Sequence, residues 1–310
     1  MKLLAKFFGL VILTTLVSCG PHSNSQLQPG NSGEQPSSTS EKVEFQQEPA
    51  DTNITSGINI DSVFTQDDTL SYGGYTVVKQ KKNVQIEQTE GSSEVSYAVL
   101  KRNGKDVAKF DGVYSGSGNA TNFGSFSFLG NDNRQLIVSQ TIPRNGRHWI
   151  VDLSSDFRII YDSADYGVGR EDLSVLDIDR DGRYEILQED VSFTGFYNLS
   201  MAKSPMPLII FKYDEKKGEY IPANHLFMEY ELRNIWSKIA KLIPENTVPD
   251  LSTILDITLQ YVYAGEEQKG WDFFDVEYKN PDKEDIKSKA KAILAKQPVY
   301  KFIYGKSGTK

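Results

Sequence analysis

The sequence predicts an α+β protein, in which an antiparallel β-domain is followed by a C-terminal α-helical domain. Two patterns in the chain of 310 residues lead to this prediction. Between Ile58 and about Ala223, short runs of alternating apolar and polar residues are separated by turn-forming residues, which is typical of antiparallel strands. After His225, apolar residues recur at the spacing of amphipathic helices. We therefore expect a β-rich domain over residues 57–224 and a helical domain over residues 225–310.

The first eighteen residues have the pattern of a secretory signal peptide. Lys2 and Lys6 precede an apolar run that is too short to span a bilayer, which needs roughly 20 apolar residues. Residues 16–19, Leu-Val-Ser-Cys, resemble the bacterial lipoprotein box. This resemblance implies that residues 1–18 are removed and that Cys19 becomes the acylated first residue of the mature protein. The alternative is an ordinary signal peptide in which the single cysteine of the chain stands at this position by chance.

The N-terminus also predicts where the protein resides. Acyl chains on Cys19 would anchor it to a membrane of the bacterial cell envelope. In enteric-type bacteria, Gly20 rather than Asp after the cysteine resembles the outer-membrane sorting signal. Residues 19–56 are rich in Ser, Gln, Gly and Pro and poor in aliphatic residues, so we expect a disordered tether between membrane and folded body.

Strands are predicted as a series of hairpins. Residues 75–78 are expected to form a strand, residues 79–82 (Lys-Gln-Lys-Lys) a turn, and residues 84–87 the next strand. Asn103 and Gly104 between two alternating runs predict a tight hairpin turn. The hairpins expected from these patterns are 96–100 with 107–110, 149–153 with 158–161, and 208–213 with 220–221.

Helices are predicted over four segments of the last third: 226–243, ending before Pro244, 251–262, ending near Gly265, 266–278, and 285–296. Residues 283–301 also have the pattern of a basic amphipathic helix with a solvated face. The aromatic residues of this part only loosely resemble a TPR helical hairpin, since their spacing does not fit that repeat of 34 residues.

Charge and composition exclude several function classes. The net charge of −8 would repel a phosphate backbone, so we expect no nucleic-acid partner. One cysteine cannot form an internal disulfide or a multi-cysteine metal site. The chain has no G-x-S-x-G elbow of a serine hydrolase. Pairs of acidic residues could serve a glycosidase, but the sequence does not tell how far apart they lie in space.

The most informative motif is the acidic loop, residues 177–185, with the sequence DIDRDGRYE. Carboxylates at alternate positions, a glycine at the sixth and an acid at the ninth can direct oxygen atoms at one hard cation such as calcium. An EF-hand would need a Glu at position twelve, where Gln188 stands, and flanking helices, whereas residues 173–176 and 186–187 predict strands. An acidic β-turn on a solvated surface, without a metal, is the alternative.

The acidic loop with its flanking strands resembles the FG-GAP or VCBS-type repeat, the calcium-loop blade of integrin-α-like β-propellers. In this repeat the motif D-x-D-x-D-G-x-x-[DE] lies between two strands. The resemblance covers about residues 172–223 and implies that calcium braces the loop without taking part in catalysis. The ligands it implies are Asp177, Asp179, Asp181, Arg183 through its carbonyl oxygen, and Glu185.

A weaker copy of this unit lies about 50 residues upstream. Residues 127–132 align with residues 174–179, and residues 135–137 align with residues 185–187. Gly130 stands where the first acidic ligand would be, so we expect no metal in the copy. A period near 50 residues is typical of propeller-like blades, and the length of the β-rich domain allows about three, which leaves a propeller unclosed.

An aromatic segment follows the acidic loop. Phe193, Phe196 and Tyr197 could form an exposed binding loop, and packing between blades is the alternative. Taken together, these patterns predict a non-enzymatic lipoprotein that binds or assembles with a protein or a glycan. A tethered hydrolase acting on cell-envelope polymers is the alternative, and a third hypothesis makes the helices the partner surface.

Overall fold

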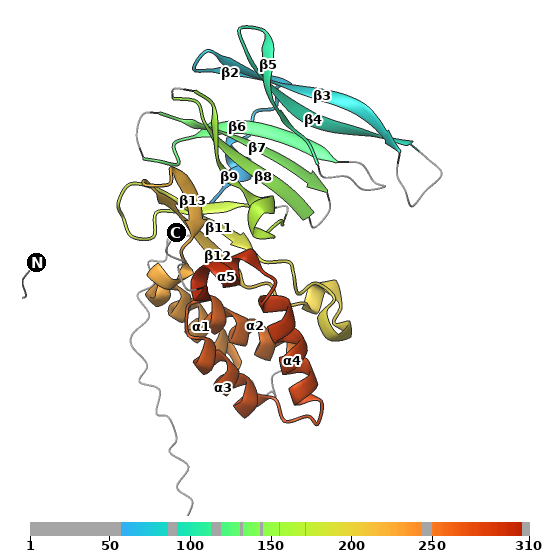
Figure 1. Ribbon diagram of the computed structural model, residues 1–310, viewed down its shortest axis with the longest axis vertical. Coiled ribbons are helices and arrows are strands. Elements are labelled where there is room, and N and C mark those ends of the chain that lie inside the picture. Colours follow the sequence, from blue (N-terminus) through green and yellow to red (C-terminus); the bar gives the residue numbers. More distant parts are fainter. Residues whose placement is uncertain are drawn as a thin grey trace, which may run out of the picture. The chain divides into compact units, whose positions relative to one another are not determined.

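Three antiparallel β-sheets precede five α-helices in the computed structural model (Figure 1). The structure describes residues 57–85, 92–112, 119–130, 133–142, 145–154, 156–170, 172–242 and 250–305. The predicted signal peptide, Cys19 and tether lie outside these residues. The α+β class predicted from the sequence is confirmed.

The N-terminal sheet contains four strands in chain order: β2 (Thr69–Tyr72), β3 (Tyr75–Gln85), β4 (Ser92–Arg102) and β5 (Lys105–Phe110). The predicted hairpin between β4 and β5 is confirmed. Asn103 and Gly104 form its turn with φ angles of 51° and 74°, the left-handed backbone that an Asn-Gly turn favours.

The turn predicted at residues 79–82 is wrong, because β3 runs through them without interruption. Pairing with β4 continues along the whole strand, from Tyr75 opposite Arg102 to Gln85 opposite Ser92. Acidic partners on neighbouring segments balance the lysines of this stretch, which makes so charged a segment compatible with a strand. The ion pairs are Lys79 with Asp68, Lys81 with Glu94, and Lys82 with Asp111.

The middle sheet buries both of its faces. Its strands are β6 (Ala120–Phe126), β7 (Gln135–Ile142), β8 (Asn145–Asp152) and β9 (Arg158–Asp162). Leu136 and Trp149 pack in one hydrophobic cluster with residues of the N-terminal sheet. Ile137 and Ile150, which follow them directly, pack in a second cluster with the C-terminal sheet. Successive side chains of a strand point to opposite faces, so two adjacent residues serve two cores.

The C-terminal sheet has the strand order β1-β10-β11-β12-β13. Its members are β1 (Ile58–Asn59), β10 (Ser174–Leu176), β11 (Glu185–Glu189), β12 (Leu208–Asp214) and β13 (Glu219–Pro222). The predicted hairpins that end the middle and C-terminal sheets, β8 with β9 and β12 with β13, are confirmed. Residues 127–129, which align in sequence with β10, instead form a turn after β6.

The helices are α1 (Met228–Leu242), α2 (Leu251–Tyr263), α3 (Glu267–Glu277), α4 (Lys283–Leu294) and α5 (Pro298–Tyr304). Asp250 caps α2 by accepting a hydrogen bond from the amide of Thr253. A single helix over residues 283–301 is wrong, because α4 ends at Leu294 and α5 begins at Pro298. Proline has no amide hydrogen to donate and is favoured at the first position of a helix.

Short 3-10 turns complete the secondary structure: η1 (Ile60–Val63), η2 (Ser163–Tyr166), η3 (Phe196–Asn198), η4 (Met201–Lys203) and η5 (Asn224–Leu226). Among the described helices, none combines the length and the apolar character needed to cross a bilayer.

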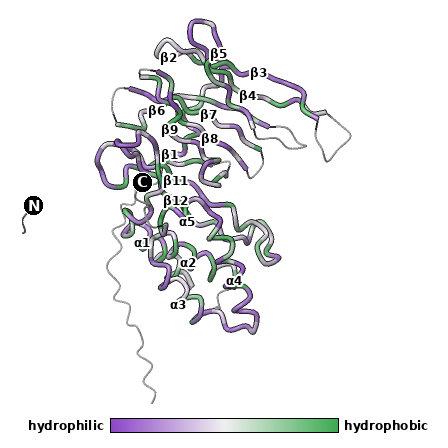
Figure 2. The backbone as a smooth tube through the Cα atoms, viewed as in Figure 1, coloured by the Kyte–Doolittle hydropathy of each residue, from purple (hydrophilic) through white to green (hydrophobic). Residues whose placement is uncertain are grey.

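One hydrophobic cluster joins the sheets to the helices. It contains Ile137 of the middle sheet, Phe211 of the C-terminal sheet, Leu259 of α2 and Trp271 of α3. Hydrophobic stretches occur in the sheets and in the helices that supply it (Figure 2), and β12 alone contributes Ile209 and Phe211. The β-rich part and the helices therefore share a core.

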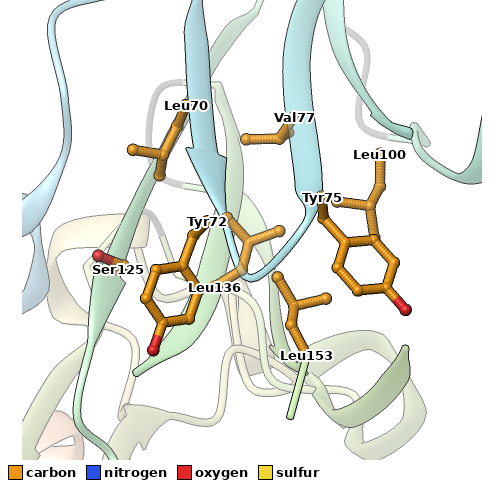
Figure 3. Close-up of a pocket in the computed structure, with 8 residues that line it drawn as sticks. All are labelled: Leu70, Tyr72, Tyr75, Val77, Leu100, Ser125, Leu136 and Leu153. Atoms are coloured by element: carbon orange, nitrogen blue, oxygen red, sulfur yellow. The ribbon is translucent and has the colours of Figure 1, made fainter. Parts of the chain in front are cut away.

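A small cavity remains between the N-terminal and middle sheets. Its volume is about 10 Å³ and its lining is almost entirely apolar, with Ser125 the one small polar side chain among leucines, Val77 and two tyrosines (Figure 3). A site without several polar partners does not hold a water molecule well. We regard this cavity as a packing gap.

Candidate metal centre

The acidic loop connects two paired strands of the C-terminal sheet. Leu176 at the end of β10 is opposite Glu185 at the start of β11, which confirms the strands predicted on either side of the loop. The chain reverses through left-handed backbone at Arg180 (φ 60°) and Gly182 (φ 83°). Glycine adopts this conformation at little cost, which accounts for its place at the sixth position.

Hydrogen bonds within the loop fix three of its carboxylates. Asp177 Oδ2 accepts from the Gly182 amide at 3.1 Å, and Asp181 Oδ1 accepts from the Arg183 amide at 2.8 Å. Glu185 Oε2 accepts from the Ile178 amide at 2.8 Å. These hydrogen bonds orient Asp177, Asp181 and Glu185 within the loop.

Three of the predicted ligands come together. One oxygen each of Asp177, Asp179 and Glu185 lies within 4.8 Å of the others. Asp177 Oδ1 is buried and has no hydrogen-bond partner among the described residues. Arg183 directs its guanidinium to Glu215 at 2.5 Å, and its contribution through the carbonyl oxygen stays a prediction.

Lys212, which the sequence motif does not include, lies among these carboxylates. Its Nζ is 2.6 Å from Asp179 Oδ2, 2.9 Å from Asp181 Oδ2 and 3.3 Å from Glu185 Oε1. The pairing of β11 with β12 joins Ile186 to Phe211, and one further step in this register brings Glu185 opposite Lys212. An acidic and a basic residue opposite each other on paired strands attract. Because β11 and β12 are not joined by a short turn, the sequence does not reveal which residues of the two strands lie opposite each other.

Burial and the lysine have opposing effects on the carboxyl groups. Burial raises the pKa of Glu185 to about 7, because the hydrogen bond from Ile178 and the charge of Lys212 only partly compensate. Burial also opposes ionisation of Asp181, but hydrogen bonds from Lys212 and the Arg183 amide outweigh it and lower the pKa. Burial lowers the pKa of Lys212, yet its bonds to Asp179 and Asp181 raise it above the usual value overall.

The loop also touches the connection between β6 and β7 of the middle sheet. The Tyr184 amide donates to the carbonyl of Phe128 at 2.9 Å, and the Tyr220 hydroxyl donates to the carbonyl of Tyr184 at 3.0 Å. A side chain at Gly130 would begin 1.6 Å from the carbonyl oxygen of Gly182. The glycine that replaces the first ligand in the weaker copy is therefore required by the approach of the acidic loop.

The predicted aromatic binding loop buries its two phenylalanines. Phe193 is 0% exposed and Phe196 is also buried, and both belong to the core shared with the helices. Their rings pack edge to face on each other. Only Tyr197 reaches the surface, where it lines a shallow depression with Lys289 and Ile293 of α4. The alternative of internal packing thus holds for the two phenylalanines.

A serine and a histidine meet in the middle sheet. Ser139 Oγ lies 2.7 Å from His148 Nδ1, and His148 Nε2 lies 2.8 Å from the carbonyl of Arg170. Both side chains are only 1% exposed, so no substrate can reach them. This pair supports the sheet and does not form a hydrolase site.

Comparisons with known proteins add little. No family model matches the sequence, and no curated protein matches it. Among solved structures, the Bombyx mori GH32 beta-fructofuranosidase BmSUC1 is similar at a TM-score of 0.22 and 14% identity, covering 50% of this chain and 35% of that chain. A mutant of the same enzyme in complex with sucrose is similar at a TM-score of 0.22 and 13% identity, with the same coverage. These scores are too low to carry an inference, and the lipoprotein, FG-GAP and TPR resemblances stay predictions.

Proposed function

We propose that this protein is a lipid-anchored, exported lipoprotein whose cation-braced β-repeats present a non-enzymatic binding or assembly surface to a protein or a glycan. The observation that carries the proposal is the convergence of Asp177, Asp179 and Glu185 at the contact between two sheets. A cation bound there would act on the junction of the sheets, because the loop hydrogen-bonds to the neighbouring sheet through Tyr184.

The donor set fits calcium. All of the converging atoms are carboxylate oxygens, which hard cations prefer. The buried, unpartnered Oδ1 of Asp177 also favours a cation, since a buried carboxylate oxygen without a partner among the described residues is costly. Calcium would supply positive charge to the loop and would take no part in a reaction.

The repeat architecture supports propeller-like blades. Each of the three sheets is built mainly from four consecutive strands, and the middle sheet packs against a neighbour on each face. Blades of a propeller have this meander order. Three blades are fewer than closed propellers contain, so we propose an unclosed array.

The lipid anchor rests on residues 16–19, and the mature N-terminus tests it directly. We expect mass spectrometry of protein isolated from bacterial membranes to find a chain that begins with acylated Cys19, and Cys19→Ala to release the protein from the membrane. An unmodified N-terminus at another residue would contradict the anchor.

Thermal unfolding tests the cation brace. A soluble chain of residues 57–310 would be heated with calcium, with magnesium and with chelator. We expect calcium to raise the melting temperature, and Asp179→Asn to abolish this rise. Asp156→Asn is the matched control, because Asp156 is an exposed carboxylate on another segment that connects two strands. Equal melting temperatures with calcium and chelator would leave the loop as a plain acidic turn.

The alternative, a tethered hydrolase of cell-envelope polymers, needs two carboxyl groups held apart across an open cleft. The acidic loop instead holds its carboxylates together around a lysine. Release of soluble fragments from purified cell-wall material by the chain of residues 57–310 would favour the hydrolase over the binding role.

A further inference from the structure

We infer that Lys212 is an internal counter-cation of the acidic loop, which holds the loop together without metal and competes with a divalent cation for the same oxygens. The inference deepens the proposed function and rests on its cation site. Lys212 would then set the affinity of the site and let the protein fold at low calcium.

The distances place the ammonium group where a bound dication would meet it. Lys212 Nζ lies 2.6 Å from Asp179 Oδ2 and 3.3 Å from Glu185 Oε1. A calcium ion would bind carboxylate oxygens at roughly 2.3–2.6 Å. An ion bound to these oxygens would therefore lie close to the ammonium group, and the two positive charges would repel each other.

One ammonium group does not satisfy the whole loop. The ion pairs of Lys212 are with Asp179, Asp181 and Glu185, whereas Asp177 Oδ1 is buried without a partner among the described residues. Arg183 is paired with Glu215. A dication can thus improve on the lysine by reaching an oxygen that the lysine leaves alone.

Lys212 can leave the loop without unfolding the strand. Its side chain is 26% exposed, and a lysine has four rotatable side-chain bonds that lead the ammonium group to water. The ring of Phe227, whose centroid is 5.7 Å from Nζ, offers a second favourable contact beside the loop.

Isothermal titration with CaCl2 tests the competition on wild type and Lys212→Met of the chain 57–310. Methionine keeps much of the length of the side chain and removes its charge. We expect Lys212→Met to bind calcium at least about tenfold more tightly, because the dication no longer displaces an ammonium group. In chelator we expect this variant to melt at a lower temperature than wild type, and we expect added calcium to remove this difference.

Lys216→Met is the matched control. It removes one positive charge, as Lys212→Met does, but Lys216 lies in the turn between β12 and β13, where its amide donates to Asp214. Its calcium affinity should equal that of the wild type. If Lys212→Met does not fold, Lys212→Gln repeats the measurement with a polar side chain.

The outcomes separate the inference from the proposal beneath it. Equal calcium affinities of wild type and Lys212→Met would overturn the competition and leave the cation site in place. Measurable binding by wild type together with tighter binding by Lys212→Met would support both. Absence of binding by either protein would overturn the cation site itself and the inference with it.

Discussion

His148 is buried in β8, with both ring nitrogens in hydrogen-bonding distance of a partner. A carbonyl oxygen can only accept, so Nε2 donates to Arg170, and the neutral ring then accepts at Nδ1 from Ser139. Burial lowers the pKa of His148 to about 4, although the bond to Arg170 acts in the opposite direction. The folded protein therefore keeps this ring neutral under mildly acidic conditions.

This low pKa predicts an acid-dependent loss of stability. The unfolded chain binds a proton at His148 near pH 6.5, and the folded chain only near pH 4. Stability from this residue is complete above pH 6.5 and falls as the pH drops towards 4, by up to roughly 3 kcal/mol. We expect His148→Gln to remove this slope from the free energy of unfolding, measured with urea at each pH.

His225→Gln is the control, because His225 is exposed. Glu185 changes the free energy of unfolding in the opposite direction. Because its pKa is raised in the folded protein, the stability that Glu185 contributes is present below about pH 4.5 and is lost as the pH rises through 7. The difference between wild type and His148→Gln cancels this contribution. An unchanged slope in His148→Gln would contradict the assignment to His148.

At the scale of residues, the sequence predicts that side chains meet in space only where they are close along the chain. Asp177, Asp179 and Glu185 converge because one loop holds them, so their spacing alone indicates the cluster. Lys212 comes from another strand, and nothing in the spacing of the motif points to it. The prediction that Phe193 is exposed is wrong for a similar reason. A short aromatic segment does not show which of its side chains pack into the core.

At the scale of elements, the contact between two loops determines the residue at position 130. Gly130 has a φ of 67°, and the first atom of any side chain there would lie 1.6 Å from the Gly182 carbonyl oxygen. Backbone atoms surround this point, so no side chain can rotate away to make room.

Gly130→Ala is therefore expected to be far more harmful than a glycine substitution in an open turn. Gly104 has a φ of 74°, and no atom lies within 4 Å of the place that an alanine methyl group would take, so Gly104→Ala should cost only the left-handed backbone strain of about 1 kcal/mol. Gly130→Ala adds overpacking of about 1–3 kcal/mol. Urea unfolding of both variants measures the difference, and equal losses would show that the two loops do not touch.

Hairpins are the elements that the sequence predicts best. In β4 with β5, and in β12 with β13, period-two alternation and a short turn lie within one local segment. The turn predicted within β3 is wrong because of long-range contacts. Lys81 and Lys82 form ion pairs with Glu94 and Asp111 on other segments. Local composition marks these lysines as a turn, and only the partners show why they fit a strand.

At the scale of the whole molecule, a buried hydrogen bond links the helices to the C-terminal sheet. The Tyr263 hydroxyl in α2 donates to Asp190 Oδ2, just after β11, at 2.6 Å. Asp190 is 2% exposed, and burial raises its pKa while this bond and those of Ser192 lower it. The sequence predicts α2 and β11 separately and gives no sign that a pair so far apart along the chain joins them.

Tyr263→Phe tests whether the sheets and helices unfold together. The substitution leaves a buried carboxylate oxygen without its donor, at a cost of about 1–3 kcal/mol. Because one hydrophobic cluster spans both parts, we expect the loss to appear equally in hydrogen exchange of peptides from β7 and from α2. Tyr97→Phe is the control, since its hydroxyl bonds to Gln80 within the N-terminal sheet. If only α2 lost protection in Tyr263→Phe, the helices would be a separately folding domain, and the boundary expected near residue 224 would also be a boundary of stability.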